Sequence, residues 1–440
     1  MQAFCRYLPS MRPLPGFRTS RGFPQWREHL RDTLWFAPTA GLIVTFVLWD
    51  IARLGDAELA KILADAGTGV RDFTDDAKTI VTTVSQAILT FLGVVFSISL
   101  VALQMTSGQL TPRVVRIFVR SRITKATLTV FLSTFMFSLL VLSSYNDPLI
   151  EERTAPVPLL QSLLTLALVG LSLLLFIAYV TSTVRLMQVG PVVDHITREA
   201  LHALDRLPAP AGAPPQLPEQ TGLIAYQGRP GVLRAVDVKR LVRCARQHGV
   251  VLRTIPRVGD YLLPGIPLLA VHGGRGAPPA TVGHVTWVGS ERSALQDRGF
   301  ALRQLADIAL RALSAAVNDP TTAVQCLDHI VHLLATLVTQ RLGPVAHHDR
   351  AGQVRLVQAA PRWPEVVDVG IAELRAAAVG QAQVTRRLLA GINDLLALVP
   401  EGRREPLLGH KTLLERAVHQ AHGDHAERAF ALQPDRQGIG

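Results

Sequence analysis

Residues 79–107 read TIVTTVSQAILTFLGVVFSISLVALQMTS, and this stretch decides the fold class of the chain. No charged residue occurs between Lys78 and Arg113, so the segment is long enough to cross the roughly 30 Å hydrocarbon core of a bilayer with some tilt. Polar and small side chains recur along it at alternating steps of three and four, with one position skipped at Leu100, which places them on one side of a helix. The members of this polar stripe are Thr79, Thr83, Gln86, Thr90, Gly93, Ser97 and Gln104.

The polar stripe predicts that one side of this span contacts protein or water, because lipid offers no hydrogen-bond partner. In one interpretation, Thr90, Gly93 and Ser97 allow the close approach of a neighbouring helix, and the stripe is a packing seam. In the other, several copies of the chain come together and the stripe lines a pore, with Gln86 and Gln104 as polar rings. The spacing is compatible with both interpretations.

Three further apolar segments bring the predicted number of membrane spans to four. They cover residues 34–49, 127–144 and 157–184, and the span within the opening stretch covers residues 80–105. The N-terminal segment and the second connection are rich in arginine, whereas the first and third connections are rich in acidic residues. Because basic connections stay on the cytoplasmic side, we expect a multi-pass protein of the bacterial inner membrane with both termini in the cytoplasm.

The second connection contains several arginines and no acidic residue. We call this group the basic collar, and its members are Arg113, Arg116, Arg120 and Arg122. The topology signal itself accounts for the collar. The same residues would also concentrate anions at a pore mouth or bind acidic lipids.

The composition of the remaining sequence changes several times, which indicates a membrane part and a soluble part. We expect a membrane α-helical fold with four transmembrane helices, followed by a cytosolic α+β domain that has a small β-barrel-like part and a helical part. The expected divisions are a basic N-terminal segment (1–30), the transmembrane domain (31–186), a helix with a proline-rich linker (187–220), a small mixed β subdomain (221–290), a helical subdomain (291–430) and a polar tail (431–440).

The segment GDYLLPGIPLLAV, residues 259–271, looks like half of a small barrel of the biotinyl or lipoyl type. A glycine-aspartate turn precedes a proline-glycine turn and an apolar strand. A carrier domain also needs a lysine in the following hairpin, and residues 273–287 contain none. We therefore predict a structural barrel-like part and expect no cofactor.

The C-terminal third has the periodicity of helices. In the segment FALRQLADIALRALSAAV, residues 300–317, the side opposite the apolar face bears alternating charges. The sequence Asn318-Asp319-Pro320 then interrupts the pattern, and Asp319 is placed to cap the next helix with Pro320 at its first position. Further helices are predicted at 321–342, 366–399 and 406–430.

Two candidate sites lie around this interruption. The candidate ligand-binding corner between two helices consists of Asn318, Asp319, Thr321 and Thr322, and the candidate subunit interface consists of Arg303, Asp307 and Arg311. Helix capping and a solvated ladder of charges explain the same residues without a ligand.

Three segments together resemble a known family. They are ALRALSAAVNDPTTAVQCLDHI (309–330), LVALQMTSGQLTPRVVRIFVRSR (100–122) and VGDYLLPGIPLLAV (258–271). The family is a bacterial integral-membrane family known as domain of unknown function 2254, and the resemblance extends over nearly the whole chain after residue 30. It implies inner-membrane spans followed by a cytosolic domain, and it supplies no activity, ligand or catalytic residue. The sequence has Ala315 where we expect proline.

Several classes of function find no support in the sequence. There is no phosphate-binding loop with its lysine, no Gly-x-Ser-x-Gly and no His-Glu-x-x-His, so we do not expect an enzyme. The histidines at 410, 419, 422 and 425 are not joined by cysteine and lie near the C-terminus, so we expect no metal site. The net charge of +11 comes from arginines spread throughout the chain, with no basic stripe interleaved with aromatic residues, so we expect no nucleic-acid partner.

The leading hypothesis is an oligomeric channel or pore-like membrane protein with a cytosolic regulatory or assembly domain. It rests on the neutral polar stripe, the basic collar and the large soluble part. The alternative is a membrane-anchored sensor or scaffold whose cytosolic domain binds a partner or a small ligand. The expected partners are the lipid bilayer and further copies of the chain, and the sequence identifies no ion or ligand.

Overall fold

The computed structural model describes residues 33, 35–65, 74–109, 121–145, 158–206, 215–274, 285–293 and 296–438. The chain separates into two compact units, divided between Val192 and Val193. We call the described part of residues 22–192 the bundle unit and the described part of residues 193–440 the mixed unit. Each is described by itself.

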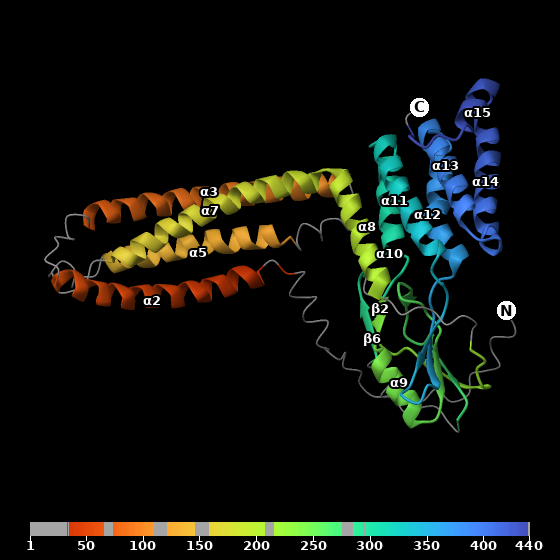
Figure 1. Ribbon diagram of the computed structural model, residues 1–440, viewed down its shortest axis with the longest axis horizontal. Helices are drawn as coiled ribbons and strands as arrows, with labels where there is room; N and C mark the ends of the chain where they lie inside the picture. The colour runs from red at the N-terminus through yellow and green to blue at the C-terminus, as the bar shows by residue number, and fades with distance from the viewer. Residues whose placement is uncertain are drawn as a thin grey trace. The chain divides into compact units, whose positions relative to one another are not determined.

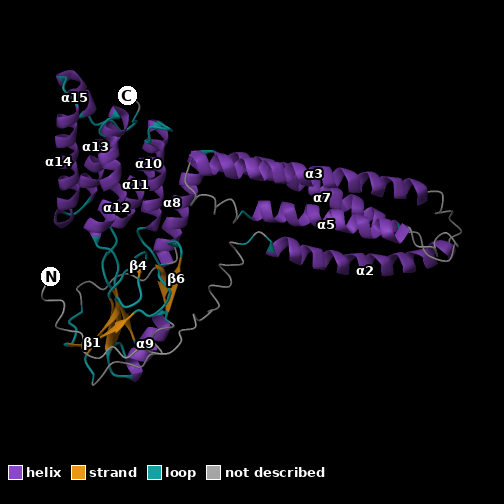
Figure 2. Ribbon diagram, turned by 180° about the vertical axis from the view of Figure 1, so that it is seen from behind, coloured by secondary structure: helices purple, strands orange, loops and turns teal. Residues whose placement is uncertain are grey.

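The bundle unit consists of long helices that lie side by side in Figures 1 and 2. They are α2 (Phe36–Asp65), α3 (Thr74–Gln109), α5 (Arg122–Tyr145) and α7 (Leu159–Met187). Helix α5 contacts each of the other three. A helix therefore lies at each of the four segments predicted as spans, and α2 and α3 extend beyond those segments because their charged ends remain helical.

Aromatic side chains fill the middle of the bundle unit. Phe131, Phe137 and Tyr179 are fully buried. The Tyr179 hydroxyl lies 2.5 Å from Oγ of Ser99 on α3 and 3.2 Å from the carbonyl oxygen of Val95. The buried Tyr179 hydroxyl therefore has hydrogen-bond partners on a neighbouring helix, as burial away from water requires.

Five helices of the described chain are long and apolar enough to cross a membrane. Four are the helices of the bundle unit, and the fifth is α11 (Pro320–Val338) of the mixed unit. In α11 half of the apolar window is buried within the protein, against 11–33% in the other four. The predicted number of four spans is therefore not confirmed by length and composition.

The mixed unit contains two β-sheets, drawn in orange in Figure 2. Their strands are β1 (Gln220–Ala225), β2 (Gly231–Val236), β3 (Val251–Thr254), β4 (Tyr261–Leu262), β5 (Pro267–His272), β6 (Thr286–Gly289), β7 (Val345–His348) and β8 (Val354–Gln358). One sheet has the order β1-β5-β3-β8-β7 and the other has the order β4-β2-β6. The expected barrel-like part is not confirmed, since these strands form two separate sheets.

Strands β7 and β8 lie within residues 291–430, which the sequence predicted as a helical subdomain. Strand β8 pairs in parallel with β3, with Leu252 opposite Leu356. The β part of the mixed unit therefore extends beyond residue 290. The sheet core also includes helix α9 (Val238–Gln247), whose Leu241 and Ala245 are fully buried against it.

Besides α9, the mixed unit has helices on both sides of β1–β6 in the sequence, and the first of them, α8, begins before the division at Val193. They are α8 (Val189–Arg206), α10 (Phe300–Ala312), α11, α12 (Trp363–Ala378), α13 (Ala382–Leu398), the 3₁₀ turn η4 (Glu401–Arg403), α14 (Glu405–Ala421) and α15 (His425–Ala431). The predicted helix 366–399 is divided between α12 and α13, and the predicted helix 406–430 is divided between α14 and α15. Helix α13 is central, because it contacts α11, α12, α14 and α15.

The predicted polar tail lies along α13. The Asp435 carboxylate is 3.4 Å from the Arg386 guanidinium, and Arg436 donates to Asp394 at 2.7 Å. The Arg386 guanidinium also lies 4.2 Å from the centre of the Phe430 ring. Together these contacts attach the C-terminal residues to the helical core.

Candidate functional site

Helix α3 exposes the polar stripe and buries the opposite face. Its buried residues are Val81, Ser85, Ile88, Val95 and Ala102. At about 100° per residue, the polar stripe is centred roughly 180° from this buried face. All seven residues of the stripe are exposed: Thr79, Thr83, Gln86, Thr90, Gly93, Ser97 and Gln104. The stripe therefore points away from α5 and α7.

Apolar side chains flank the polar stripe on both sides. They include Ile80, Leu89, Val94, Phe96, Leu100 and Val101, all of which are exposed. The exposed surface of α3 thus has an apolar border around a polar centre. Apolar flanks are suited to lipid, whereas a polar centre needs protein or water beside it.

Within the part of the chain that the structure describes, some side chains of the polar stripe form hydrogen bonds and others do not. The Thr83 hydroxyl donates to the carbonyl of Thr79 at 2.9 Å, and the Thr90 hydroxyl donates to that of Gln86 at 3.2 Å. Within the described chain, the carboxamides of Gln86 and Gln104 make no hydrogen bond. Between the two glutamines lie Gly93 and Ser97, four residues apart, with the small side chains that allow close helix contact.

A second polar group in the bundle unit was missed from the sequence. Asp56 of α2 is only 2% exposed, and its carboxylate accepts hydrogen bonds from the backbone N–H of Leu160 at 2.6 Å and from Nε2 of Gln161 at 3.0 Å. Gln161 Oε1 accepts from Ser144 Oγ, which in turn accepts from Trp49 Nε1. Asp56 therefore satisfies the free N–H groups at the start of α7 and carries negative charge at the positive end of that helix.

The basic collar is largely outside the described residues. Arg113, Arg116 and Arg120 lie there, and the proposal of an anion-binding collar stays a prediction for them. Arg122 is the first residue of α5 and is exposed.

The predicted subunit interface and the predicted ligand-binding corner lie at two separate places on the helices. Arg303 donates to Asp307 on the same helix at 2.7 Å and makes a bidentate contact with Glu373 on α12. This contact raises the pKa of Arg303 and lowers that of Glu373. Arg311 is exposed near the end of α10. The three residues of the predicted interface thus belong to the side of α10, where Arg303 links α10 to α12.

The residues of the predicted ligand-binding corner lie where α10 is followed by α11. Asn318 has φ of 48°, a left-handed conformation that asparagine tolerates, and its side chain accepts from Gln381 Nε2 at 3.0 Å. Asp319 accepts from the N–H of Thr322 at 3.0 Å and from its hydroxyl at 2.6 Å. The predicted cap with Pro320 in the first turn is confirmed, while Thr321 is exposed.

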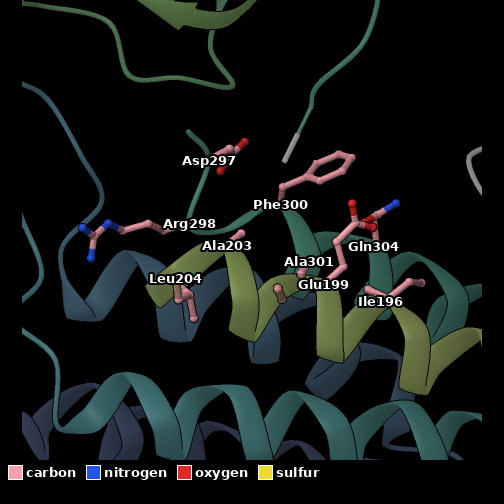
Figure 3. A pocket seen from close by; sticks show the side chains of 10 residues that line it. Ile196, Glu199, Ala203, Leu204, Asp297, Arg298, Phe300, Ala301 and Gln304 are labelled. Atoms are coloured by element: carbon pink, nitrogen blue, oxygen red, sulfur yellow. The ribbon is translucent and has the colours of Figure 1, made fainter. Parts of the chain in front are cut away.

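A recess lies between α8 and the start of α10 in the mixed unit (Figure 3). It has an empty volume of about 360 Å³, part of which is open to solvent. Asp297 lines the recess and is paired with Arg292 at 2.7 Å. Burial raises the pKa of Asp297, although Arg292 and the N–H of Gly299 act in the opposite direction. The charge of Asp297 is therefore already paired within the protein.

Helix α8 is attached to α11 by a hydrogen bond between Thr197 and His329. His329 Nδ1 lies 2.8 Å from Thr197 Oγ1, and the same hydroxyl donates to the Val193 carbonyl at 2.9 Å. Burial lowers the pKa of His329, which Asp194 and Asp328 oppose. Neutral His329 is thus the form that the folded protein favours.

Acidification from pH 7.5 to 5.5 should lower the unfolding temperature of the chain, and His329→Asn should reduce this decrease. The unfolded chain binds the His329 proton near pH 6.5 and the folded chain binds it at lower pH. The stabilisation is therefore complete above about pH 6.5 and is lost as the pH falls toward the folded-state pKa. Thermal unfolding in detergent at both pH values measures the decrease in unfolding temperature. His425→Asn, at an exposed site, is the control. An equal decrease in all three proteins would contradict the prediction.

The histidines near the C-terminus contact separate partners. His410 Nε2 is 2.9 Å from Asp368, and His422 Nε2 is 3.2 Å from the carbonyl oxygen of Val379. In the described residues, no group of three or more histidine, cysteine or acidic side chains is arranged to hold a metal ion.

The sequence is similar to a family of predicted membrane proteins and to uncharacterized mycobacterial proteins. The sequence model of a family described as predicted membrane protein (DUF2254) matches residues 31–394. Uncharacterized proteins of Mycobacterium tuberculosis and Mycobacterium bovis are each 28% identical to this chain over 429 residues, which covers 92% of this chain and 80% of the relative. No solved structure matches the chain significantly.

Proposed function

This chain belongs to the family of predicted membrane proteins known as domain of unknown function 2254, and from that premise we propose that it is a multi-pass membrane protein whose copies assemble through α3 and enclose a pore-like path. The observation that carries the proposal is the position of the polar stripe. Seven polar or small residues lie on the side of α3 opposite to its buried face. In a bilayer this side needs protein or water. Further copies of α3 would supply the protein contact, and the path that they enclose would supply the water.

We further propose that α2, α3, α5 and α7 are the membrane spans and that α11 is not. Helix α11 buries half of its apolar window and packs against α10 and α13. Its core side chains include Cys326, whose pKa burial raises to about 12. With four spans, the arginine-rich segments lie on the cytoplasmic side of a bacterial inner membrane, together with both termini and the mixed unit.

The path in this proposal runs between copies and not through one bundle unit. The middle of each bundle holds the buried rings of Phe131, Phe137 and Tyr179, which leave its centre packed. On α3 the middle of the stripe has small side chains at Thr90, Gly93 and Ser97. The lining is neutral, so selectivity would come from width and from the carboxamides of Gln86 and Gln104. The mixed unit would regulate or assist assembly.

The test measures ion flux from liposomes together with the oligomeric mass of the purified chain. Gly93→Leu should lower both the flux and the fraction of oligomer, because the new side chain prevents close approach of α3 helices. Gly170→Leu is the matched control, since an added Cβ meets no atom within 4 Å at Gly93 or at Gly170. A monomeric wild-type protein in tightly sealed liposomes would refute the proposal.

The second candidate is a membrane-anchored sensor or scaffold. It is favoured by α8, which follows the last helix of the bundle unit after Gln188 and is attached to α11 through Thr197 and His329. Partner binding at the mixed unit would then be the function, and the stripe would be a packing seam. Gln86→Leu and Thr90→Val decide between the two: a change in assembly without any flux in the wild type supports the sensor or scaffold.

A further inference from the structure

Helix α9 has two faces of opposite character. Leu241 and Ala245 are fully buried, and Val238, Val242 and Cys244 pack against the same sheet core. The apolar face of this helix is therefore used within the protein. It is not available for insertion into a hydrophobic partner or into the acyl region of a membrane.

The opposite face of α9 is mostly basic, with Gln247 as a neutral member. Its exposed side chains include four cations, Lys239, Arg240, Arg243 and Arg246. At about 100° per residue they occupy an arc of roughly 120°. Asp237, the acidic residue beside them, is engaged as the helix N-cap and accepts from the N–H of Arg240 at 3.0 Å. Across the described ranges, none of the four cationic side chains forms an ion pair.

We propose that this cationic face of α9 docks on an anionic phospholipid surface. Four unpaired cations on one side of a helix fit a surface of repeated negative charges, and the chain belongs to a membrane-protein family. Because the apolar face is buried in the sheet core, the contact is electrostatic and stays at the headgroups. The helix carries no aromatic side chain on which a nucleic-acid base would stack, which favours lipid over nucleic acid. This inference does not depend on a pore.

The test uses the full chain held in nanodiscs of neutral phosphatidylcholine and mixed with vesicles. One set of vesicles is phosphatidylcholine alone, and the other contains about one third phosphatidylglycerol. The nanodisc-held protein should float with the anionic vesicles at low salt and be released at high salt, because salt screens the contact. Each basic residue near such a surface strengthens binding about fivefold, so Arg243→Gln with Arg246→Gln should weaken it about 25-fold.

The matched control replaces two exposed arginines elsewhere, Arg350→Gln with Arg416→Gln, and should bind like the wild type. Circular dichroism checks that both double variants keep their helix content. Equal binding by the two double variants would overturn the proposal, because net charge and not α9 would then govern it. Binding that resists salt, or binding of a 20-nucleotide RNA without binding of anionic vesicles, would also overturn it.

Discussion

Gly259→Ala is expected to destabilise the mixed unit by about 4 kcal/mol, the combined cost of a strained backbone and of overpacking. Gly259 has φ of 101°, which residues with a side chain rarely adopt. A Cβ at this position would lie 2.7 Å from Oδ2 of Asp297 and 2.9 Å from Nε of Arg292. It would therefore push apart an ion pair in which the Asp297 side chain is buried, as well as strain the turn.

The backbone at Gly259 cannot move away easily, because its N–H donates to the carbonyl of Leu233 at 2.8 Å. Gly265→Ala is the control: Gly265 has a similar φ of 90°, but an added Cβ meets nothing within 4 Å. We expect this control to cost only about 1–3 kcal/mol, from backbone strain alone. Thermal unfolding of both variants in detergent measures the difference. Equal losses would show that the contact with Asp297 and Arg292 is unimportant.

Asp56→Ala should destabilise the bundle unit by about 3 kcal/mol, since hydrogen bonds to a charged group are lost and their donors remain buried. The carboxylate of Asp56 accepts from the N–H groups of Leu160 and Gln161 and from the Gln161 side chain. Without it, the first turn of α7 keeps unsatisfied N–H groups, and the Gln161 amide loses its partner.

The control for Asp56→Ala is Asp50→Ala on the same helix, where the carboxylate is exposed. The loss of folded protein on heating in detergent measures the stability of both variants. Asp56→Asn should fall between the wild type and Asp56→Ala, because the amide oxygen still accepts hydrogen bonds but carries no charge. If Asp50→Ala and Asp56→Ala have the same effect, Asp56 does not anchor α7.

Local features of the sequence were sufficient to predict some parts of the structure. Asp319 and Pro320 stand next to each other at the start of α11, and a cap needs only the next few residues, so the pattern identified it correctly. The polar stripe of α3 likewise follows from helical spacing. Whether that stripe faces a neighbouring helix of the same chain depended on the other helices, and the structure places it on the exposed surface of the bundle unit.

Asp56 could not be predicted in the same way. Its acidic neighbours in the sequence suggested an outer connection, whereas the structure continues α2 through it to Asp65. Its partners are backbone N–H groups about one hundred residues further on, and backbone groups leave no signature in side-chain patterns. The pairing of β3 with β8 was missed for the same reason, since short strands far apart in the sequence do not indicate which neighbour they will join.

Because β3 pairs with β8, the five-stranded sheet can be completed only late in the synthesis of the chain. Strand β3 ends at Thr254, but its second neighbour begins only at Val354. Until that residue leaves the ribosome, one edge of β3 has no strand beside it, and an unpaired edge favours aggregation. A nascent chain stopped between these residues would hold every helix of the bundle unit and an unfinished sheet. The last part of the sheet is therefore a late step of folding, delayed by the long segment that builds α10 and α11 first.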